Sequence, residues 1–400
     1  MPLPSRLAEH RQTAAQILSD SRIILVVWLI VGLAPSLVQL HKGNNNNYLM
    51  FHYSFTHLVH QQNLYAFYPD QYRDNFKYGP LFCLFMAPFT VLPTSLACVL
   101  FVLVSACVLY LAIQSLPLEK TTRNIFGLLC LFEFWNNQGH FHSNAIMAGF
   151  IILSFTCILR DKTVLAALYV ALGTFIKLYG VVGLLFLVFS RRKGKFLIAL
   201  AGWSVVFYLL PALLSSLPFV NASYADWFAA LQEKNRLNAT LGIFQDISVM
   251  GFVRRLVGNP NISEVPFLIT GGVLLLLPYL RTSCYGDRHF RFLALACVLM
   301  FAVLFSTSSE NPTYIILQCG VAAWFCAGSR LPLRPRVGLL LIVFLFSSIT
   351  PTDLFPHALG DFYNAHSLRI LPCAAVWLVA LYEMLVCRIT LEERPQVATA

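Results

Sequence analysis

The chain has 400 residues, of which 58% are hydrophobic and only 12% are charged, with a formal net charge of +10. An ordinary soluble domain has roughly a quarter charged residues, so this composition excludes a protein whose whole surface faces water. The positive charge does not indicate nucleic acid as a partner. The basic residues form short clusters between apolar runs, with no basic helix, zinc pattern or aromatic-basic repeat.

The polar N-terminal segment, residues 1–22, precedes the first apolar run and predicts a cytoplasmic segment rather than a cleaved signal peptide. The 11 cysteines include no CxxC pair, and nearly all of them lie within apolar segments. A thiol in such surroundings behaves as a small hydrophobic group. We therefore predict no disulfide framework.

Apolar runs that could cross ~30 Å of hydrocarbon, alone or paired as hairpins, recur along the chain. They lie at residues 23–41, 97–115, 124–136, 144–160, 163–177, 178–190, 196–217, 264–281, 292–308, 313–327, 337–350 and 370–386. We predict an all-α, polytopic transmembrane protein with about 12 spans, counted from these runs. Its single transmembrane domain covers residues 23–386, followed by a cytoplasmic tail at 387–400.

The clearest basic cluster, Arg191 to Lys195, predicts the cytoplasmic side, because short cytoplasmic loops are enriched in Lys and Arg. Both termini are then cytoplasmic, and the long loops at 42–79, 218–265 and 351–369 are external. With this parity the apolar segment Gly79 to Pro93 cannot be a full crossing, so we predict a re-entrant or interfacial segment. Most of the histidines and many of the acidic residues lie on the external side, which predicts a site there.

Three stretches carry a resemblance to a known family. The first includes Asn47 to His52 and continues to Lys77-Tyr78-Gly79-Pro80; the second is Asn137, Gln138 and Asn144; the third is Phe175 to Gly180, around Lys177. In this order they resemble motifs of glycosyltransferase family 87, within the GT-C superfamily of polyprenyl-phosphate-sugar-dependent membrane transferases. That family includes mycobacterial phosphatidylinositol mannoside mannosyltransferases. The resemblance covers residues 40–190, and beyond residue 200 only the layout is similar.

The resemblance implies a GT-C-like fold whose external loops form the site. It implies a hexosyltransferase, with mannose the best guess, that uses a polyprenyl-phosphate sugar as donor. The acceptor would be a lipid or a glycan, the sugar would be transferred with inversion, and no cofactor would be needed. We expect the cell (inner) membrane, although the sequence does not distinguish it from an endoplasmic reticulum membrane.

The sequence departs from the family at the residue that should act as the catalytic base. The family's first-loop Asp falls on Asn47, and an amide cannot take a proton at neutral pH. Asp74 is our first candidate for the missing base, because it lies close to the point where the chain returns to the membrane. Asp70 follows a proline in a predicted turn, and Glu310 lies in a predicted external turn where it could equally act as a helix cap.

Other polar residues are candidates for substrate binding. Lys177 interrupts an apolar run, which predicts a contact with the donor phosphate, although a lysine reaching the interface would look the same. Arg254 and Arg255 are external against the charge bias and predict a phosphate contact, with a solvated charge run as the alternative. The remaining candidates for binding substrate are Asn47, His52, Lys77, Gln138, His140 and Asn144.

We predict no metal site. His140 and His142 are two residues apart, but no acidic partner lies on the same turn, so the pair would make a poor zinc site. The rival functional class is a transporter or flippase of a lipid-linked sugar, which would need the same phosphate and sugar contacts without a base. A transporter should show internal hydropathy repeats, and none is convincing in this sequence.

Overall fold

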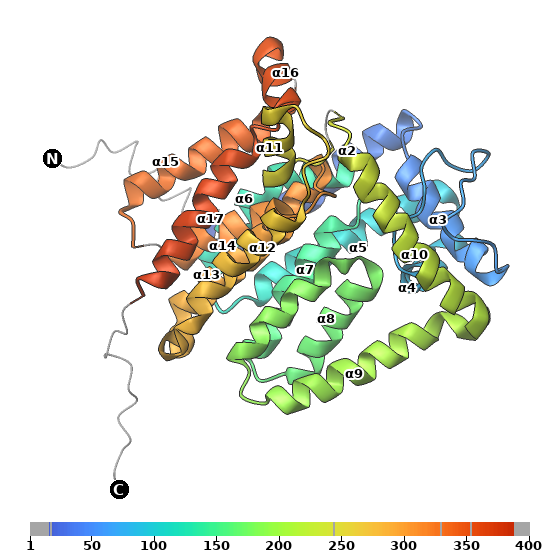
Figure 1. Ribbon diagram of the computed structural model, residues 1–400, viewed down its shortest axis with the longest axis horizontal. Helices are drawn as coiled ribbons and strands as arrows, with labels where there is room; N and C mark the ends of the chain where they lie inside the picture. Colours follow the sequence, from blue (N-terminus) through green and yellow to red (C-terminus); the bar gives the residue numbers. More distant parts are fainter. Residues whose placement is uncertain (1–15, 17, 243–244, 329, 353, 388–400) are drawn as a thin grey trace, which may run out of the picture.

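The computed structural model describes residue 16 and residues 18–242, 245–328, 330–352 and 354–387. All of the regular secondary structure in these residues is helical, and they contain no strand (Figure 1). This confirms the prediction of an all-α fold.

The N-terminal half of the chain forms helices joined mostly by short turns. They are α2 (Ser21–His41), α3 (Asn46–Val59), α4 (Pro80–Thr90), α5 (Thr94–Ser115), α6 (Lys120–Gly139), α7 (Asn144–Leu159), α8 (Thr163–Ile176), the 3₁₀ segment η1 (Leu178–Phe189), α9 (Lys193–Leu209) and η2 (Leu210–Leu213). The apolar runs predicted in this region therefore form helices, although several of them are short.

The C-terminal half begins with a polar helix and continues with further apolar ones. The elements are α10 (Leu217–Asn238), α11 (Val249–Val257), α12 (Val265–Leu276), η3 (Leu277–Leu280), η4 (Thr282–Gly286), α13 (Arg288–Leu304), η5 (Asn311–Thr313), α14 (Tyr314–Ala327), α15 (Leu333–Val343), the π-helical turn η6 (Phe344–Ile349), α16 (His357–Ala365) and α17 (Ile370–Leu385).

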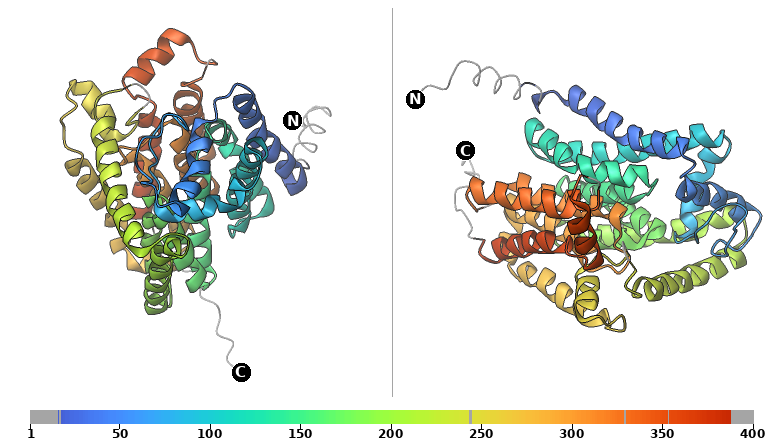
Figure 2. Two further views of the ribbon diagram at one scale, coloured as in Figure 1. Left: turned by 90° about the vertical axis from the view of Figure 1, so that its right-hand side faces the viewer. Right: turned by 90° about the horizontal axis from the view of Figure 1, so that it is seen from above.

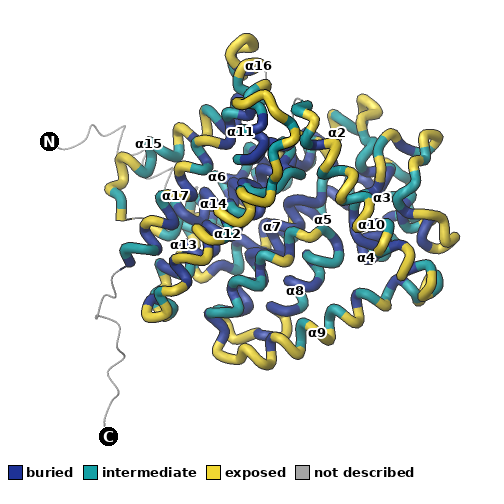
Figure 3. Tube along the Cα trace, in the orientation of Figure 1, coloured by how far each residue is buried: buried dark blue, intermediate teal, exposed yellow. Residues whose placement is uncertain are grey.

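The centre of the bundle consists of α7, α13 and α14, whose residues are buried on almost every side (Figure 3). A helix that is apolar all round belongs in the interior of a bundle. Helices α2, α5 and α6 pack along one side of this centre, and α17 packs on α13 on the other (Figure 2). Helix α9 lies at the edge of the molecule against α8, with most of its apolar side chains at least partly exposed.

Only some of the helices are long enough to cross a bilayer alone. Among the described residues, Ser21–His41, Thr94–Ser115 and Lys193–Leu213 meet that requirement, and α16 with α17 would be a fourth if the 60° bend between them lies within one span. Helix α4 has 11 residues, about half the ~20 needed for a crossing. The apolar helices of a multi-pass membrane protein are present, while the number of spans and the re-entrant role of α4 remain predictions.

Each of the three predicted external loops contains at least one helix. Residues 42–79 contain α3, residues 218–265 contain α10 and α11, and residues 351–369 contain α16. Helix α3 lies near the start of the first loop, and its aromatic residues Tyr48 and Phe51 are fully buried against protein.

Arg281 and Arg330, which the predicted topology places on the cytoplasmic side, both contact the C-terminal end of α17. Arg281 donates hydrogen bonds to the carbonyls of Leu385 and Cys387, and Arg330 donates to the carbonyl of Val386. These contacts bring the ends of η3, α14 and α17 together, as the predicted topology requires. The orientation itself remains a prediction.

Cysteine labelling tests that orientation. Of the native cysteines only Cys107 is exposed, so its replacement should leave a low labelling background. A cysteine at Leu256, whose side chain is 67% exposed, should react with an impermeant maleimide added outside intact cells. A cysteine at the exposed Lys195 should react only after the membrane is opened. The reverse pattern would overturn the orientation.

Candidate active site

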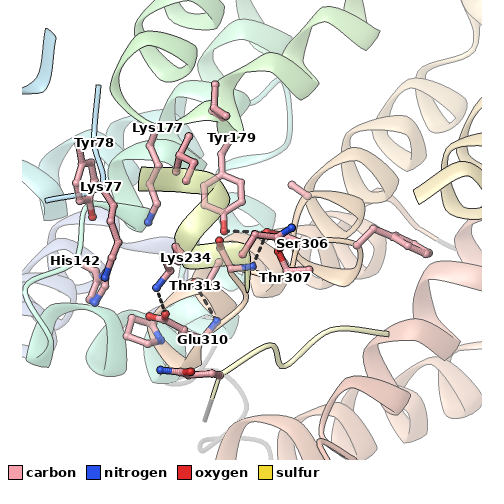
Figure 4. Close-up of a pocket in the computed structure, with 18 of the residues that line it drawn as sticks. Lys77, Tyr78, His142, Lys177, Tyr179, Lys234, Ser306, Thr307, Glu310 and Thr313 are labelled. Atoms are coloured by element: carbon pink, nitrogen blue, oxygen red, sulfur yellow. Dashed lines mark hydrogen bonds and ion pairs between the residues drawn. The ribbon is translucent and has the colours of Figure 1, made fainter. Parts of the chain in front are cut away.

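A cavity of about 1160 Å³ is formed by the first loop, the α8–η1 connection, α10 and the turn between α13 and α14 (Figure 4). Its lining is rich in polar and charged groups. These are Asn47, Asp74, Lys77, Tyr78, His140, His142, Lys177, Tyr179, Gln232, Lys234, Asn235, Gln245, Glu264, Ser306, Thr307, Ser308, Glu310, Asn311 and Thr313. The cavity also has an apolar wall that includes Leu178, Val181, Leu268, Phe301 and Phe305.

Backbone contacts bring the first loop onto α8. The amide of Gly79 donates a hydrogen bond to the carbonyl of Ile176 at 3.0 Å. A Cβ atom at Gly79 would lie only 2.0 Å from the carbonyl oxygen of Phe175, so a side chain there would push the two segments apart. The indole of Trp227, on α10, donates to the carbonyl of Lys77 at 3.0 Å and joins the third element to this contact.

Three lysines from these three elements extend into the cavity (Figure 4). Lys77 pairs with Asp74 at 2.7 Å, and Lys234 pairs with Glu310 at 2.5 Å. Lys177 donates instead to the amide oxygen of Asn144 at 2.7 Å. The centre of the site therefore contains three lysines and two carboxylates, so one lysine has no carboxylate partner there.

Lys177 is placed by a tight reversal of the chain. A Cβ atom at Gly180 would lie 2.3 Å from the carbonyl carbon of Gly173, so glycine at this position lets η1 fold closely against α8. The ammonium of Lys177 lies 5.2 Å and 5.3 Å from the ring centres of Tyr78 and Tyr179. Among the described residues no carboxylate lies within ion-pair distance of it, and burial lowers its pKa to about 7. An anionic ligand in the cavity would favour the charged ammonium.

Glu310 lies in the turn that joins α13 to α14. This turn is fixed from two sides, because Asn137 on α6 donates to the carbonyl of Pro312 at 2.9 Å and Asn238 on α10 donates to the carbonyl of Thr307 at 2.9 Å. Burial alone would raise the pKa of Glu310, but Lys234, and more weakly Lys177 and Lys77, outweigh it and hold the pKa below the ordinary value. The carboxylate therefore remains ionised at neutral pH.

Asn47 and His142 adjoin each other at the edge of the cavity. The Asn47 amide nitrogen donates to the carbonyl of His140 at 2.9 Å and lies 3.2 Å from Nε2 of His142. Burial lowers the pKa of His142 well below its ordinary value, and the nearby Lys177 lowers it further. The imidazole is neutral at pH 7 and can accept this hydrogen bond through Nε2. The position of the family's Asp therefore carries an uncharged donor.

Six of the residues proposed from the sequence line this one cavity. They are Asn47, Asp74, Lys77, His140, Lys177 and Glu310. Asn144 does not line the cavity, but its amide oxygen accepts a hydrogen bond from the ammonium of Lys177 and so positions that group. The prediction that these distant motifs form one site on the same side is consistent with this arrangement.

Two other proposed residues are used for packing instead. Gln138 is fully buried. Its side-chain amide donates to the carbonyl of Val102, and its backbone carbonyl accepts from the hydroxyl of Ser36. His52 lies beside the rings of Tyr48 and Tyr53. Neither residue lines the cavity, and Asp70 also lies outside it at an exposed position.

Arg254 and Arg255 also lie outside the cavity, and their guanidinium groups make contacts within the protein. Arg254 is buried and pairs with Asp246 at 2.9 Å and with Glu264 at 3.1 Å. Arg255 donates to the carbonyls of Asp246, Gly251, Gly242 and Gln245. They brace the segment around α11, and the structure does not place them where the three lysines meet.

Sequence reasoning missed Lys234, which lies in the predicted external loop at residues 218–265. The signal was helical spacing: Trp227, Leu231 and Lys234 follow one another at i, i+4 and i+7, and all three line the cavity. Tyr179 was also missed; its hydroxyl lies 3.5 Å from that of Ser306. Within the described residues, no group of three or more His, Cys, Asp or Glu side chains is arranged to hold a metal ion.

An all-α bundle of apolar helices with a lysine-rich cavity at one end defines an integral membrane protein equipped to hold an anionic ligand. The sequence model of glycosyltransferase family 87 matches residues 76–307, more than half of the chain. The chain therefore belongs to glycosyltransferase family 87 and is a membrane glycosyltransferase. A search of curated proteins finds no match.

The family match extends the similarity well beyond the N-terminal motifs. It includes Lys77, Lys177 and Lys234, so all three cavity lysines lie within the matched region. Asn47 and Glu310 lie outside it.

Proposed function

We propose that this glycosyltransferase takes a hexose, mannose in the first instance, from a polyprenyl-phosphate sugar and transfers it to a lipid or glycan acceptor. The reaction would occur at the external face of the cell membrane, without a cofactor. The observation that carries the proposal is the convergence of Lys77, Lys177 and Lys234 on one cavity that also has an apolar wall. A phosphate carried by a long hydrocarbon chain needs both features.

The chemistry requires one base and one stabilised leaving group. A carboxylate takes the proton from the acceptor hydroxyl as its oxygen attacks C1 of the sugar. The bond between C1 and the phosphate oxygen breaks with its electron pair, and polyprenyl phosphate leaves. Attack from the face opposite the phosphate inverts the anomeric centre. Lysine ammonium groups stabilise the negative charge that develops on the departing phosphate.

Asp74 remains the preferred base. Its Oδ1 accepts from Lys77 and from the amide of Asn75, no described residue donates to Oδ2, and the side chain is 47% exposed. Glu310 experiences the charge of three lysines, which lowers its pKa and makes it a weaker proton acceptor. We assign to Glu310 the role of orienting Lys234 and balancing the cationic cluster.

Donor choice is the direct test. Protein purified into nanodiscs should transfer label from polyprenyl-phosphate [¹⁴C]mannose to an extract of its native membrane lipids and glycans, whereas GDP-[¹⁴C]mannose should give no product. Polyprenyl-phosphate glucose offered in parallel tests the choice of sugar, and empty nanodiscs give the background. Transfer from the nucleotide sugar instead would contradict the proposed donor.

A further inference from the structure

A second cavity, of about 1090 Å³, lies on the other side of α6. Helix α6 supplies one wall through Leu128, Phe132 and neighbouring residues, α2 supplies Val31, and α15 supplies Leu340 and Leu341. Helix α15 continues into the π-helical turn η6, whose Phe344 and Ser348 extend the same wall. This volume is slightly above the range of ~300–1,000 Å³ that is typical of pockets for small ligands.

The second cavity adjoins the first. His140 and Asn311 line both of them, so the two spaces meet at the C-terminal end of α6 beside the turn that carries Glu310. Asn311 is held in place by Arg369, which donates a hydrogen bond to its side chain and itself pairs with Glu133 at 3.4 Å in the protein interior. The junction is therefore a fixed polar point between two binding spaces.

The chemistry of the two cavities differs. Among the described residues that line the second cavity, none is Lys, Arg, Asp or Glu, and most are aliphatic or aromatic. The polar residues in its lining are uncharged at the amide and hydroxyl side chains, and they include Asn136, Asn311 and Gln318 together with His140. Leu341 and Phe344 are 52% and 39% exposed, which opens the space toward the surroundings of an apolar bundle.

We propose that this second cavity is a groove for the hydrocarbon chain of a lipid acceptor, whose hydroxyl-bearing head reaches the lysine cavity past His140 and Asn311. The inference rests on the proposed function and selects a lipid over a water-soluble glycan as the acceptor. The donor is assigned to the first cavity, because that cavity contains the lysines for its phosphate and an apolar wall for its chain. A groove without charged residues and with mainly apolar walls matches a hydrocarbon chain.

Adjacent residues on α15 provide a matched pair of variants. Leu341 lines the groove, whereas Ile342, which is 44% exposed, does not. Leu341→Trp should partly fill the groove, while Ile342→Trp places the same side chain on the outer surface. With polyprenyl-phosphate [¹⁴C]mannose as donor and native membrane lipids as acceptors, the label should appear in an organic-extractable product. We expect Leu341→Trp to lower that transfer at least about tenfold at unchanged donor KM, and Ile342→Trp to match the wild type.

The outcomes separate the two proposals. Label recovered in protein or in a water-soluble glycan would overturn the acceptor groove while leaving the transferase function intact. A raised donor KM in Leu341→Trp would assign the groove to the donor chain, and equal transfer by both tryptophan variants would show that no chain uses it. Failure of the wild type to release label from any polyprenyl-phosphate sugar would instead reject the proposed function.

Discussion

Asp74→Asn is expected to lower kcat by about 100-fold or more while leaving the donor KM close to its wild-type value. The substitution keeps the size of the side chain and removes its ability to accept a proton, and a positioned general base contributes on the order of 10²–10⁴-fold to a rate. The amide oxygen can still accept the hydrogen bond from Lys77, so the first loop should remain in place. Single-turnover kinetics with a labelled donor measure the effect on the chemical step.

Two carboxylates serve as comparisons for this variant. Asp70 lies in the same loop but is exposed and outside the cavity, so Asp70→Asn should retain normal turnover. Glu310→Gln should weaken the contact with Lys234 and affect donor KM more than kcat. Near-normal turnover in Asp74→Asn, together with a collapse of kcat in Glu310→Gln, would show that Glu310 is the base.

Lys177→Leu is expected to raise the donor KM by about 10- to 100-fold. A hydrogen bond to a charged group is worth about 1.5–3 kcal/mol, and this lysine is the cavity cation with no ion-pair partner among the described residues. Leucine keeps an apolar side chain at this position and removes the ammonium that lies over the rings of Tyr78 and Tyr179. Initial rates over a range of donor concentrations, with acceptor saturating, measure the change.

Lys42→Leu is the matched control, because Lys42 follows α2 on the same predicted side and is exposed. Its replacement removes one positive charge without touching the cavity, so the donor KM should not move. Thermal unfolding of both variants in detergent distinguishes loss of binding from loss of folding. Wild-type kinetics in a folded Lys177→Leu protein would show that this lysine serves only to reach the membrane interface.

Hydropathy was sufficient to predict the helical bundle, because a lipid-facing helix must be apolar over its whole length. Hydropathy was less informative about the number of spans. Runs such as 178–190 form segments that are too short to cross a membrane as single helices. The loops were the weakest part of the prediction. Hydropathy places α10 in a long external loop, whereas its Trp227 and Lys234 lie on one helical face and form a wall of the cavity.

The site was predictable where a charge interrupts an apolar run, as at Lys177, or where motifs follow a family order. It was not predictable where long-range pairing decides what a charge does. Arg254 looked like a phosphate ligand from its position outside the membrane, but Asp246 and Glu264 occupy its guanidinium. Conversely, nothing near Lys234 in the sequence indicates Glu310, which lies 76 residues away.

Covalent transfer of the sugar from a polyprenyl phosphate is distinguished from transport of the intact donor by following both the label and its anomeric configuration. Proteoliposomes containing the purified protein, polyprenyl-phosphate [¹⁴C]mannose and native acceptor lipids are sampled over time, and the labelled product is isolated for determination of its anomeric configuration by NMR. We expect label to leave the donor, and the new glycosidic bond to have the anomeric configuration opposite to that of the donor. Label that remains on the donor, with the intact donor moving from one leaflet to the other, would contradict it and identify a flippase.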